Sequence, residues 1–378
     1  EEIQLIATST FGLEAVVNRE LLNLGYEELV VENGKVHFKG TEKDIPIANL
    51  WLRSADRVLL KMGEFKATSF EELFEKTKAL PWDECITEDG EFTVEGKSVD
   101  SQLFSISDCQ AIVKKAVVEK LKTKYHREWF QETGAKFTIE VSLLKDIATL
   151  TIDTSGPGLH KRGYRLDSVE APLKETLAAA LVQLSYWNKN RLLLDPFCGS
   201  GTIPIEAAMI GKNMAPGLNR NFASEEWPRV KREYWHNVRR EAWDLMDREP
   251  NLNIIASDID KAAIKAAKEN AENIGLEEDI KFMVKDIKNL NIKDKYGVII
   301  TNPPYGERLG EKKEIDKLYK DMGEIFKPLD TYSIYVLTSN EDFEKLYGKS
   351  ASRKRKLYNG RIKVDYYQYY GPRPPKSW

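Results

Sequence analysis

Five short apolar runs, each separated from the next by a helical stretch, dominate the second half of this chain. Their apolar residues are continuous rather than alternating, which is typical of strands covered on both faces of a parallel sheet. A hairpin pattern follows around Asn359-Gly360, the strongest dipeptide signal for a two-residue turn. We therefore expect an α/β fold over 172–378, with a mostly parallel seven-stranded sheet that ends in an antiparallel hairpin. The five runs are RLLLD (191–195), NIIASD (253–258), IKFMV (280–284), GVIIT (297–301) and YSIYVLT (332–338).

The first half of the chain has a different pattern. Over 1–65 the expected order is β-α-β-β-α-β, which is that of a ferredoxin-like unit, with a hairpin at Asn33-Gly34. Over 66–155 two helical patterns (69–80 and 107–125) accompany three β-rich runs (91–99, 136–144 and 147–155), which predicts a second α+β domain. Gly156-Pro157-Gly158 interrupts the pattern and indicates a linker over 156–171.

Composition excludes several classes of protein. No run approaches the roughly 18 apolar residues that span a bilayer, and the N-terminus lacks a signal-peptide layout. Three cysteines, Cys85, Cys109 and Cys198, are odd in number and far apart, which favours a reducing cytoplasm. Four scattered histidines and the absence of a CxxC pair argue against a zinc site. We expect a cytoplasmic protein with no membrane partner and no metal.

The segment DPFCGSGT (195–202) connects an expected strand to an expected helix through a glycine turn. Ligands of open α/β sheets bind at the carboxyl ends of the strands, and Gly199 and Gly201 would let the backbone approach one. Asp258 ends the next run and could accept hydrogen bonds from a ribose diol. Asp286 follows the third run and could receive the adenine amine, although both aspartates could also serve only as helix caps. Asp195 could orient the glycine loop or bind an ammonium group.

Two common nucleotide sites do not fit this segment. A dinucleotide fingerprint requires a third glycine where the chain has Pro204, and an acid about 20 residues further on. The P-loop pattern GxxxxGK[ST] is absent from the sequence. The pattern therefore predicts an adenosine-bearing cofactor that is not NAD.

The fourth apolar run leads directly into Asn302-Pro303-Pro304-Tyr305. Two prolines at a strand end make a rigid corner without backbone donors, which leaves its carbonyls as acceptors. The Asn302 amide oxygen and the Pro303 carbonyl could hold both hydrogens of a planar NH2 group and free its lone pair for attack on a sulfonium methyl. Tyr305 could stack on a base taken out of its helix. This corner predicts methyl transfer to an exocyclic base amine.

With these motifs the chain resembles a known family. DPFCGSGT, ASDID, VKDI and NPPYGERLG look like the cofactor and catalytic motifs of class I Rossmann-like amino-methyltransferases. HKRGYR (160–165), EAPLKETLAAA (170–180) and APGLNRNF (215–222) narrow the resemblance to THUMP-containing RNA methylases. It covers the whole chain, and within the family it is nearest to the 23S rRNA guanine-N2 type represented by the N-terminal part of RlmL.

The resemblance implies S-adenosylmethionine (SAM) as cofactor and an RNA-binding THUMP domain at 66–155. It implies catalysis by Asn302, Pro303, Pro304 and Tyr305. RlmL proteins can be fused to a second methyltransferase domain that this chain lacks. We therefore expect this chain to perform one modification, not two. The expected cofactor-binding residues are Asp195, Pro196, Cys198, Gly199, Gly201, Thr202, Asp258, Ile259, Asp286, Ile287 and Asn302.

Basic segments are the candidate RNA contacts. The net charge is only −3, but 345–363 holds eight Lys or Arg and no acid, and 114–127 holds six against one acid. Either run could be a solvated face, and residues 161–165 could brace the linker against the catalytic domain. The expected phosphate contacts are Lys114, Lys115, Lys122, Lys124, Lys161, Arg162, Arg165, Arg353, Lys354 and Arg355.

Three alternatives stay open. A DNA adenine-N6 methyltransferase shares NPPY, although the two N-terminal segments argue for RNA. A tRNA guanine-N2 methyltransferase can share both the THUMP and NPPY features. A non-catalytic RNA-binding protein would retain the fold without cofactor affinity, which the intact Asp258, Asp286 and NPPY argue against. The modified nucleotide, the oligomeric state, and the choice between naked large-subunit rRNA and a ribosome assembly intermediate are not fixed by the sequence.

Overall fold

The chain folds into two compact units. The computed structural model describes residues 1–165 and 173–378, so the beginning of the EAPLKETLAAA motif and part of the expected linker lie outside the described residues. Unit 1 comprises Glu1–Ser9, Val17–Leu159 and Arg220–Glu241. Unit 2 comprises Thr10–Val16, His160–Asn219 and Ala242–Trp378.

The first elements follow the predicted β-α-β-β-α-β order. The strands lie in the spatial order β2-β3-β1-β4, with β1 between and antiparallel to β3 and β4, which confirms the ferredoxin-like arrangement. The elements are β1 (Ile3–Thr8), α1 (Glu14–Asn23), β2 (Val30–Glu32), β3 (Lys35–Gly40), α2 (Asp44–Trp51) and β4 (Arg57–Lys66).

The next segment extends the same sheet. Strand β4 pairs with β7 in antiparallel register, with Leu59 opposite Asp153, which gives one seven-stranded sheet in the order β2-β3-β1-β4-β7-β6-β5. The two α+β segments expected from the sequence therefore share a continuous backbone ladder. The elements are α3 (Phe70–Lys78), η1 (Trp82–Glu84), β5 (Glu91–Val99), α4 (Ile106–Tyr125), β6 (Lys136–Leu144) and β7 (Ile147–Asp153).

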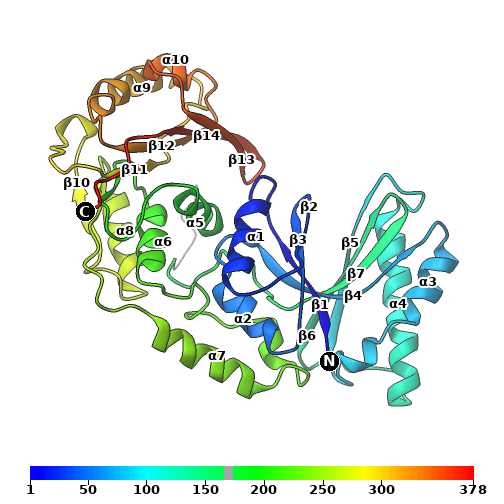
Figure 1. Ribbon diagram of the computed structural model, residues 1–378. Helices are drawn as coiled ribbons and strands as arrows, with labels where there is room; N and C mark the ends of the chain where they lie inside the picture. The colour runs from blue at the N-terminus through cyan, green and yellow to red at the C-terminus, as the bar shows by residue number, and fades with distance from the viewer. Residues whose placement is uncertain (166–172) are drawn as a thin grey trace. The chain divides into compact units, whose positions relative to one another are not determined.

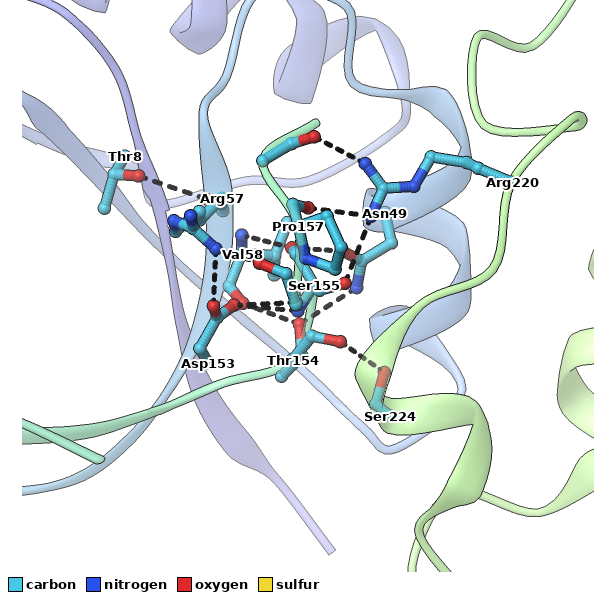
Figure 2. A network of polar contacts seen from close by, with 12 residues as sticks. Thr8, Asn49, Arg57, Val58, Asp153, Thr154, Ser155, Pro157, Arg220 and Ser224 are labelled. Carbon is cyan, nitrogen blue, oxygen red and sulfur yellow. Dashed lines mark hydrogen bonds and ion pairs between the residues drawn. The ribbon is translucent and has the colours of Figure 1, made fainter. Parts of the chain in front are cut away.

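Residues 220–241, which the sequence places inside the methyltransferase domain, belong to unit 1. Figure 2 shows how Arg220 and Ser224 of this segment meet the turn after β7. The Arg220 guanidinium donates to the carbonyls of Pro157 and Gly158 at 2.7 and 2.6 Å. The Gly-Pro-Gly segment expected to be a linker is thus held by an arginine that lies more than sixty residues further along the chain.

Unit 2 contains the predicted parallel sheet with its antiparallel end. Its strand order is β10-β9-β8-β11-β12-β14-β13, and β14 runs antiparallel to both β12 and β13 (Figure 1). The strands are β8 (Leu193–Asp195), β9 (Ile254–Asp258), β10 (Lys281–Val284), β11 (Val298–Thr301), β12 (Ser333–Thr338), β13 (Arg353–Asn359) and β14 (Ile362–Tyr369).

Alternate residues of the central strands enter two separate cores. Val298 and Ile300 pack with α5, α6 and α8, whereas Ile299 packs with α9 and α10 on the other face. Both faces of the sheet are covered, and this accounts for the continuous apolar strands seen in the sequence. The remaining elements are α5 (Glu175–Gln183), α6 (Thr202–Gly211), η2 (Ala223–Glu226), α7 (Arg232–Leu245), α8 (Lys261–Glu272), η3 (Ile287–Asn289), α9 (Lys312–Phe326) and α10 (Phe343–Tyr347).

Within the described ranges, no helix combines the length and the apolar character that a membrane crossing requires.

Candidate active site

The predicted cofactor and catalytic residues meet at one edge of the unit 2 sheet. Strands β8, β9, β10 and β11 are parallel, so the residues at their carboxyl ends share this edge. They line a cavity of about 1380 Å³. Its lining includes Asp195, Pro196, Cys198, Gly199, Thr202, Asp258, Ile259, Asp286, Ile287, Asn302, Pro303, Pro304 and Tyr305, that is, every expected cofactor and catalytic residue except Gly201.

Gly199 has the geometry for close approach to a ligand. Its φ is +51°, and a Cβ added there would meet nothing within 4 Å. Its N–H donates to Asp258 Oδ2 at 3.0 Å, which ties the loop to the end of β9. The backbone of this loop is thus fixed and uncovered on the cavity side.

Gly201 serves packing instead. Its φ is +86°, and an added Cβ would lie 3.0 Å from the Cβ of Ala267 in α8. Asn270 of the same helix donates to the Ser200 carbonyl at 3.0 Å. Gly201 therefore lets α8 close on the loop, and it is the one expected cofactor residue that does not belong to the cavity lining.

Asp195 is bonded to the loop that follows β8. Of its two predicted roles, orienting the glycine loop and binding an ammonium group, this geometry fits the first. Its Oδ1 accepts hydrogen bonds from the Phe197 N–H at 3.1 Å and the Thr301 hydroxyl at 2.7 Å. Burial raises the pKa of this carboxyl to about 7, although the bonds from Thr301 and Phe197 act in the opposite direction. Its protonation state is therefore sensitive to a nearby positive charge.

Asp258 and Asp286 both line the cavity, and Asp286 is also the N-cap of η3, whereas Asp260 rather than Asp258 caps α8. Asp258 Oδ1 accepts from the Asp260 N–H at 2.9 Å, and Asp286 Oδ1 accepts from the Lys288 N–H at 2.9 Å. Because a carboxylate offers about four acceptor positions, each retains acceptors for a ligand. The reading of Asp258 as only a helix cap is therefore wrong, and at Asp286 capping and ligand binding do not exclude each other.

The Asn302–Tyr305 corner is held by two side chains from neighbouring elements. The Tyr319 hydroxyl donates to the Pro304 carbonyl at 2.6 Å, and Asn340 Nδ2 donates to the Tyr305 carbonyl at 3.3 Å. Neither bond uses the Pro303 carbonyl. The Tyr305 hydroxyl donates to Asn302 Oδ1 at 2.6 Å, so it occupies one acceptor position of the amide oxygen expected to hold the amine.

Sequence reasoning missed the part of the site contributed by the terminal hairpin. Asn359, Gly360 and Ile362 line the cavity. Burial raises the pKa of the Tyr305 hydroxyl to about 12, and a hydrogen bond with Asn359 is the largest influence in the other direction. The signal was available, since β14 is antiparallel to β12 and the turn before β14 must lie at the carboxyl edge of the parallel strands.

Arg162 is a correction to the expected RNA contacts. It is 1% exposed, and its guanidinium lies 2.8 Å from Glu206 Oε1 in α6. Tyr164 donates to the other oxygen of Glu206 at 2.9 Å. Arg165 bonds to Thr202 at the start of α6 and lies 3.7 Å from Glu175. These side chains hold the expected linker segment against α6 of the catalytic domain, which was the alternative considered for this motif, and a buried Arg162 cannot reach a phosphate.

The expected RNA contacts on α4 all have partners within the protein. Lys114 Nζ lies 2.9 Å from Glu132 Oε1, and Lys122 Nζ lies 3.3 Å from Glu119 Oε1. Lys115 lies 5.7 Å from the Phe74 ring centroid, and Lys124 donates to the Asp83 carbonyl at 2.8 Å. A phosphate would have to compete with these partners.

The remaining expected contacts lie in two other places. Lys161 is exposed in the segment that precedes the buried Arg162. Arg353, Lys354 and Arg355 begin the edge strand β13, where Lys354 lies 3.9 Å from Asp365.

Comparison with known families gives a match for each part of the chain. Residues 162–368 match the family described as "RMKL-like, methyltransferase domain". Residues 4–59 match the RlmL ferredoxin-like domain, and residues 67–153 match the THUMP domain.

Two relatives show the extent of the similarity. The chain is 55% identical over 374 residues to the "Putative RNA methyltransferase YpsC" of Bacillus subtilis, covering 98% of this chain and 97% of that protein. It is 34% identical to the ribosomal RNA large subunit methyltransferase K/L of Syntrophotalea carbinolica over 95% of this chain. That match spans only 52% of the relative, so the chain covers about half the length of such K/L proteins.

Two solved structures share the whole fold. One, named a predicted N6-adenine-specific DNA methylase from Listeria monocytogenes, is 54% identical with a TM-score of 0.95, and the match covers 98% of this chain and 97% of that one. The other, "SMU.472, a putative methyltransferase complexed with SAH", is 47% identical with a TM-score of 0.94, over 99% and 100% of the two chains. Sheet order and cavity thus define a Rossmann-like methyltransferase preceded by ferredoxin-like and THUMP domains. The chain belongs to the RMKL-like methyltransferase family.

Proposed function

We propose that this protein transfers a methyl group from S-adenosylmethionine to the exocyclic amine of a base in RNA, namely N2 of a guanine in 23S (large-subunit) rRNA. One observation carries the proposal: the glycine loop after β8 and the Asn302–Tyr305 corner after β11 line the same cavity. A methyl donor and an amine held at these two places would face each other.

The residues around Gly199 fit an adenosine-bearing donor. The half-buried backbone of Gly199 is followed around the cavity by two carboxylates, Asp258 and Asp286, each with unused acceptor positions. We assign Asp258 to the ribose diol and Asp286 to the adenine amine. Ile259 is 70% exposed and offers an apolar surface beside them. Asp195 lies where a carboxylate would favour the ammonium of the methionine part.

The cofactor supplies an electrophilic methyl group, and the corner positions the nucleophile. Asn302 Oδ1 and the Pro303 carbonyl accept the two N–H groups of the base amine, and this grip directs the nitrogen lone pair toward the methyl. With the donor bound, a new N–C bond would form as the methyl–sulfur bond breaks, and the amine would then release one proton to solvent. Positioning accounts for most of such a rate enhancement, because no strong base is required.

RNA is the favoured substrate because the domains that precede the catalytic one are of RNA-methylase type. The K/L relatives are named for large-subunit rRNA, and the chain aligns with about half of their length. We propose that 1–65 and 66–155 form the RNA-binding part, that 156–171 is the linker, and that 172–378 is the methyltransferase domain. Phosphate contacts by Lys114, Lys115, Lys122 and Lys124 stay part of this proposal.

Mass spectrometry of nucleosides tests the proposal directly. Large-subunit rRNA from a strain lacking the gene should lack one N2-methylguanosine, and the purified protein with S-adenosylmethionine should restore it. Restoration in tRNA instead would favour the tRNA guanine-N2 activity. Failure to bind S-adenosylmethionine in calorimetry would indicate a non-catalytic RNA-binding protein.

A DNA substrate is the second candidate, because the Listeria relative is named as an adenine-specific DNA methylase. The NPPY corner fits the N6 amine of adenine as well as N2 of guanine. Parallel assays on unmodified rRNA and on duplex DNA distinguish the two, and N6-methyladenine formed on DNA alone would refute the RNA proposal.

A further inference from the structure

An exposed aromatic ring lies beside the terminal hairpin in unit 2. Phe11 is 58% exposed, and its ring meets that of Tyr358 edge-on, with 6.4 Å between centroids. Gly12 makes this approach possible, because its φ is +96° and an added Cβ would lie 2.8 Å from the Lys356 carbonyl oxygen. The loop after β1 is therefore fitted closely to β13.

The ring that Phe11 meets belongs to a residue one position from the cavity lining. Tyr358 directly precedes Asn359, which lines the cavity and forms a hydrogen bond with Tyr305. In the hairpin register Asn359 pairs with Ile362, another cavity residue, and Tyr358 pairs with Lys363. Because successive residues of a strand point to opposite faces, Tyr358 and Lys363 lie on the face of the hairpin opposite Asn359 and Ile362, one residue from the cavity lining.

The hairpin around Tyr358 carries positive charge. Lys356, Arg361 and Lys363 are exposed, and Lys356 Nζ lies 5.7 Å from the Tyr358 ring centroid. No acid occurs between residues 345 and 363. Of the acids nearest in sequence or register, Glu14 accepts a hydrogen bond from the Gly12 N–H at 2.9 Å, and Asp365 is only 7% exposed.

We propose that Phe11, Lys356, Tyr358, Arg361 and Lys363, here called the hairpin surface, hold the single-stranded nucleotides that flank the target base. One flanking base stacks on Phe11, and the three cations contact the adjoining phosphates. The inference rests on the proposed RNA substrate and adds a positioning surface to it. It differs from the expected cluster at 353–355, which lies at the other end of β13.

Chemistry favours a nucleic-acid strand over a protein partner. A base that reaches the NPPY corner must leave its helix, so its neighbours are available for stacking. Single-stranded nucleic acid is bound where aromatic rings alternate with cations along a groove. An apolar protein interface would instead be depleted of lysine.

The first test replaces the ring. Phe11→Ala should raise KM for rRNA roughly 5- to 100-fold, the range expected for the loss of one stacked base, while affinity for S-adenosylmethionine stays unchanged. Phe11→Tyr should retain the low KM. Trp378→Ala is the matched control, since Trp378 is also 58% exposed and meets Tyr296 edge-on at 5.2 Å, and it does not line the cavity.

The second test concerns charge. Replacing Lys356, Arg361 and Lys363 together by alanine should make the plot of log affinity for single-stranded RNA against log salt shallower by about 2, at roughly 0.7 for each lost phosphate contact. The control replaces three exposed lysines of the same unit, Lys281, Lys293 and Lys295, and should leave the slope unchanged.

The possible outcomes separate the two proposals. If the wild-type protein methylates rRNA and Phe11→Ala behaves like Trp378→Ala, the hairpin surface is refuted while the proposed function stands. If Phe11→Leu restores what Phe11→Ala loses, the contact is apolar rather than stacked, and the proposed base stacking on Phe11 is overturned. If the wild-type protein methylates no RNA, the proposed function fails and the inference fails with it.

Discussion

The two halves of the catalytic cavity are built in different ways. In the cofactor half, carboxylates and an amide fix the backbone: Asp258 holds the Gly199 N–H, Asp195 holds the Phe197 N–H, and Asn270 holds the Ser200 carbonyl. In the half proposed to hold the amine, here called the amine half, consecutive prolines supply rigidity, and the Asn302 amide oxygen accepts a hydrogen bond from the Tyr305 hydroxyl.

This difference suggests that one half of the cavity serves cofactor binding and the other serves the proposed methyl transfer. The cofactor half keeps its shape through bonds within the protein and presents additional acceptors to a ligand. In the other half the Asn302 oxygen is engaged with the Tyr305 hydroxyl, which under the proposed function a substrate amine has to replace or share. Substitutions in the two halves should therefore give different kinetic signatures.

Asn302→Ala should have the largest effect. Loss of the amide oxygen removes the grip on the amine, and the methyl-transfer rate should fall about 100- to 1000-fold, by analogy with the loss of one hydrogen-bonding group that stabilises a transition state. Affinity for S-adenosylmethionine, measured by calorimetry, should stay close to that of the wild type. An equal loss of both quantities would mean that Asn302 is structural, and the contrast between the two halves would disappear.

Asp258→Ala should weaken cofactor binding roughly 10- to 100-fold, because hydrogen bonds to a charged group contribute about 1.5–3 kcal/mol. The same change releases the Gly199 N–H, so part of the loss comes from the loop. Asp258→Asn retains one acceptor and is the comparison variant. Calorimetry that shows unchanged affinity for Asp258→Ala would refute the ribose assignment.

Asp195 should make cofactor binding depend on pH. Burial raises its pKa to about 7 from an ordinary value of 3.8. Because the folded protein binds this proton more tightly than the unfolded chain, the protonated carboxyl stabilises the unliganded fold below pH 4. This stabilisation is lost as the pH rises from about 4 to 7. An ammonium ligand favours the carboxylate, so affinity should fall about tenfold for each pH unit below 7. Asp195→Asn should flatten this profile between pH 5.5 and 8, and a parallel profile in the variant would contradict the assignment.

Tyr305→Phe should have the smallest effect. It removes the hydroxyl that occupies Asn302 Oδ1 while keeping the ring, so KM for RNA should decrease two- to fivefold, within the range of one net hydrogen bond. Steady-state kinetics at saturating cofactor measure it. A rise in KM would show that the hydroxyl itself contacts the base.

The sequence predicted most of what depends on local pattern. The strand-to-loop segments after β8 and β11 follow from apolar runs that end in glycine or proline, and they meet because parallel strands share an edge. What it could not predict depends on distant partners. Pairing of β4 with β7, the burial of Arg162 against Glu206, and the placement of 220–241 in unit 1 leave no periodic signal.

The placement of Thr10–Val16 in unit 2 bears on how such a protein can evolve. Leu13 and Val16 are 1% exposed and belong to the same apolar core as α5 and α6. A gene fragment that begins at residue 162, where the match to the methyltransferase family begins, would leave the space of these two side chains unfilled. Recombination is therefore not expected to transfer the methyltransferase domain without residues 10–16. Exchange of domains between members of the family should preserve residues 10–16 together with the C-terminal hairpin against which they pack.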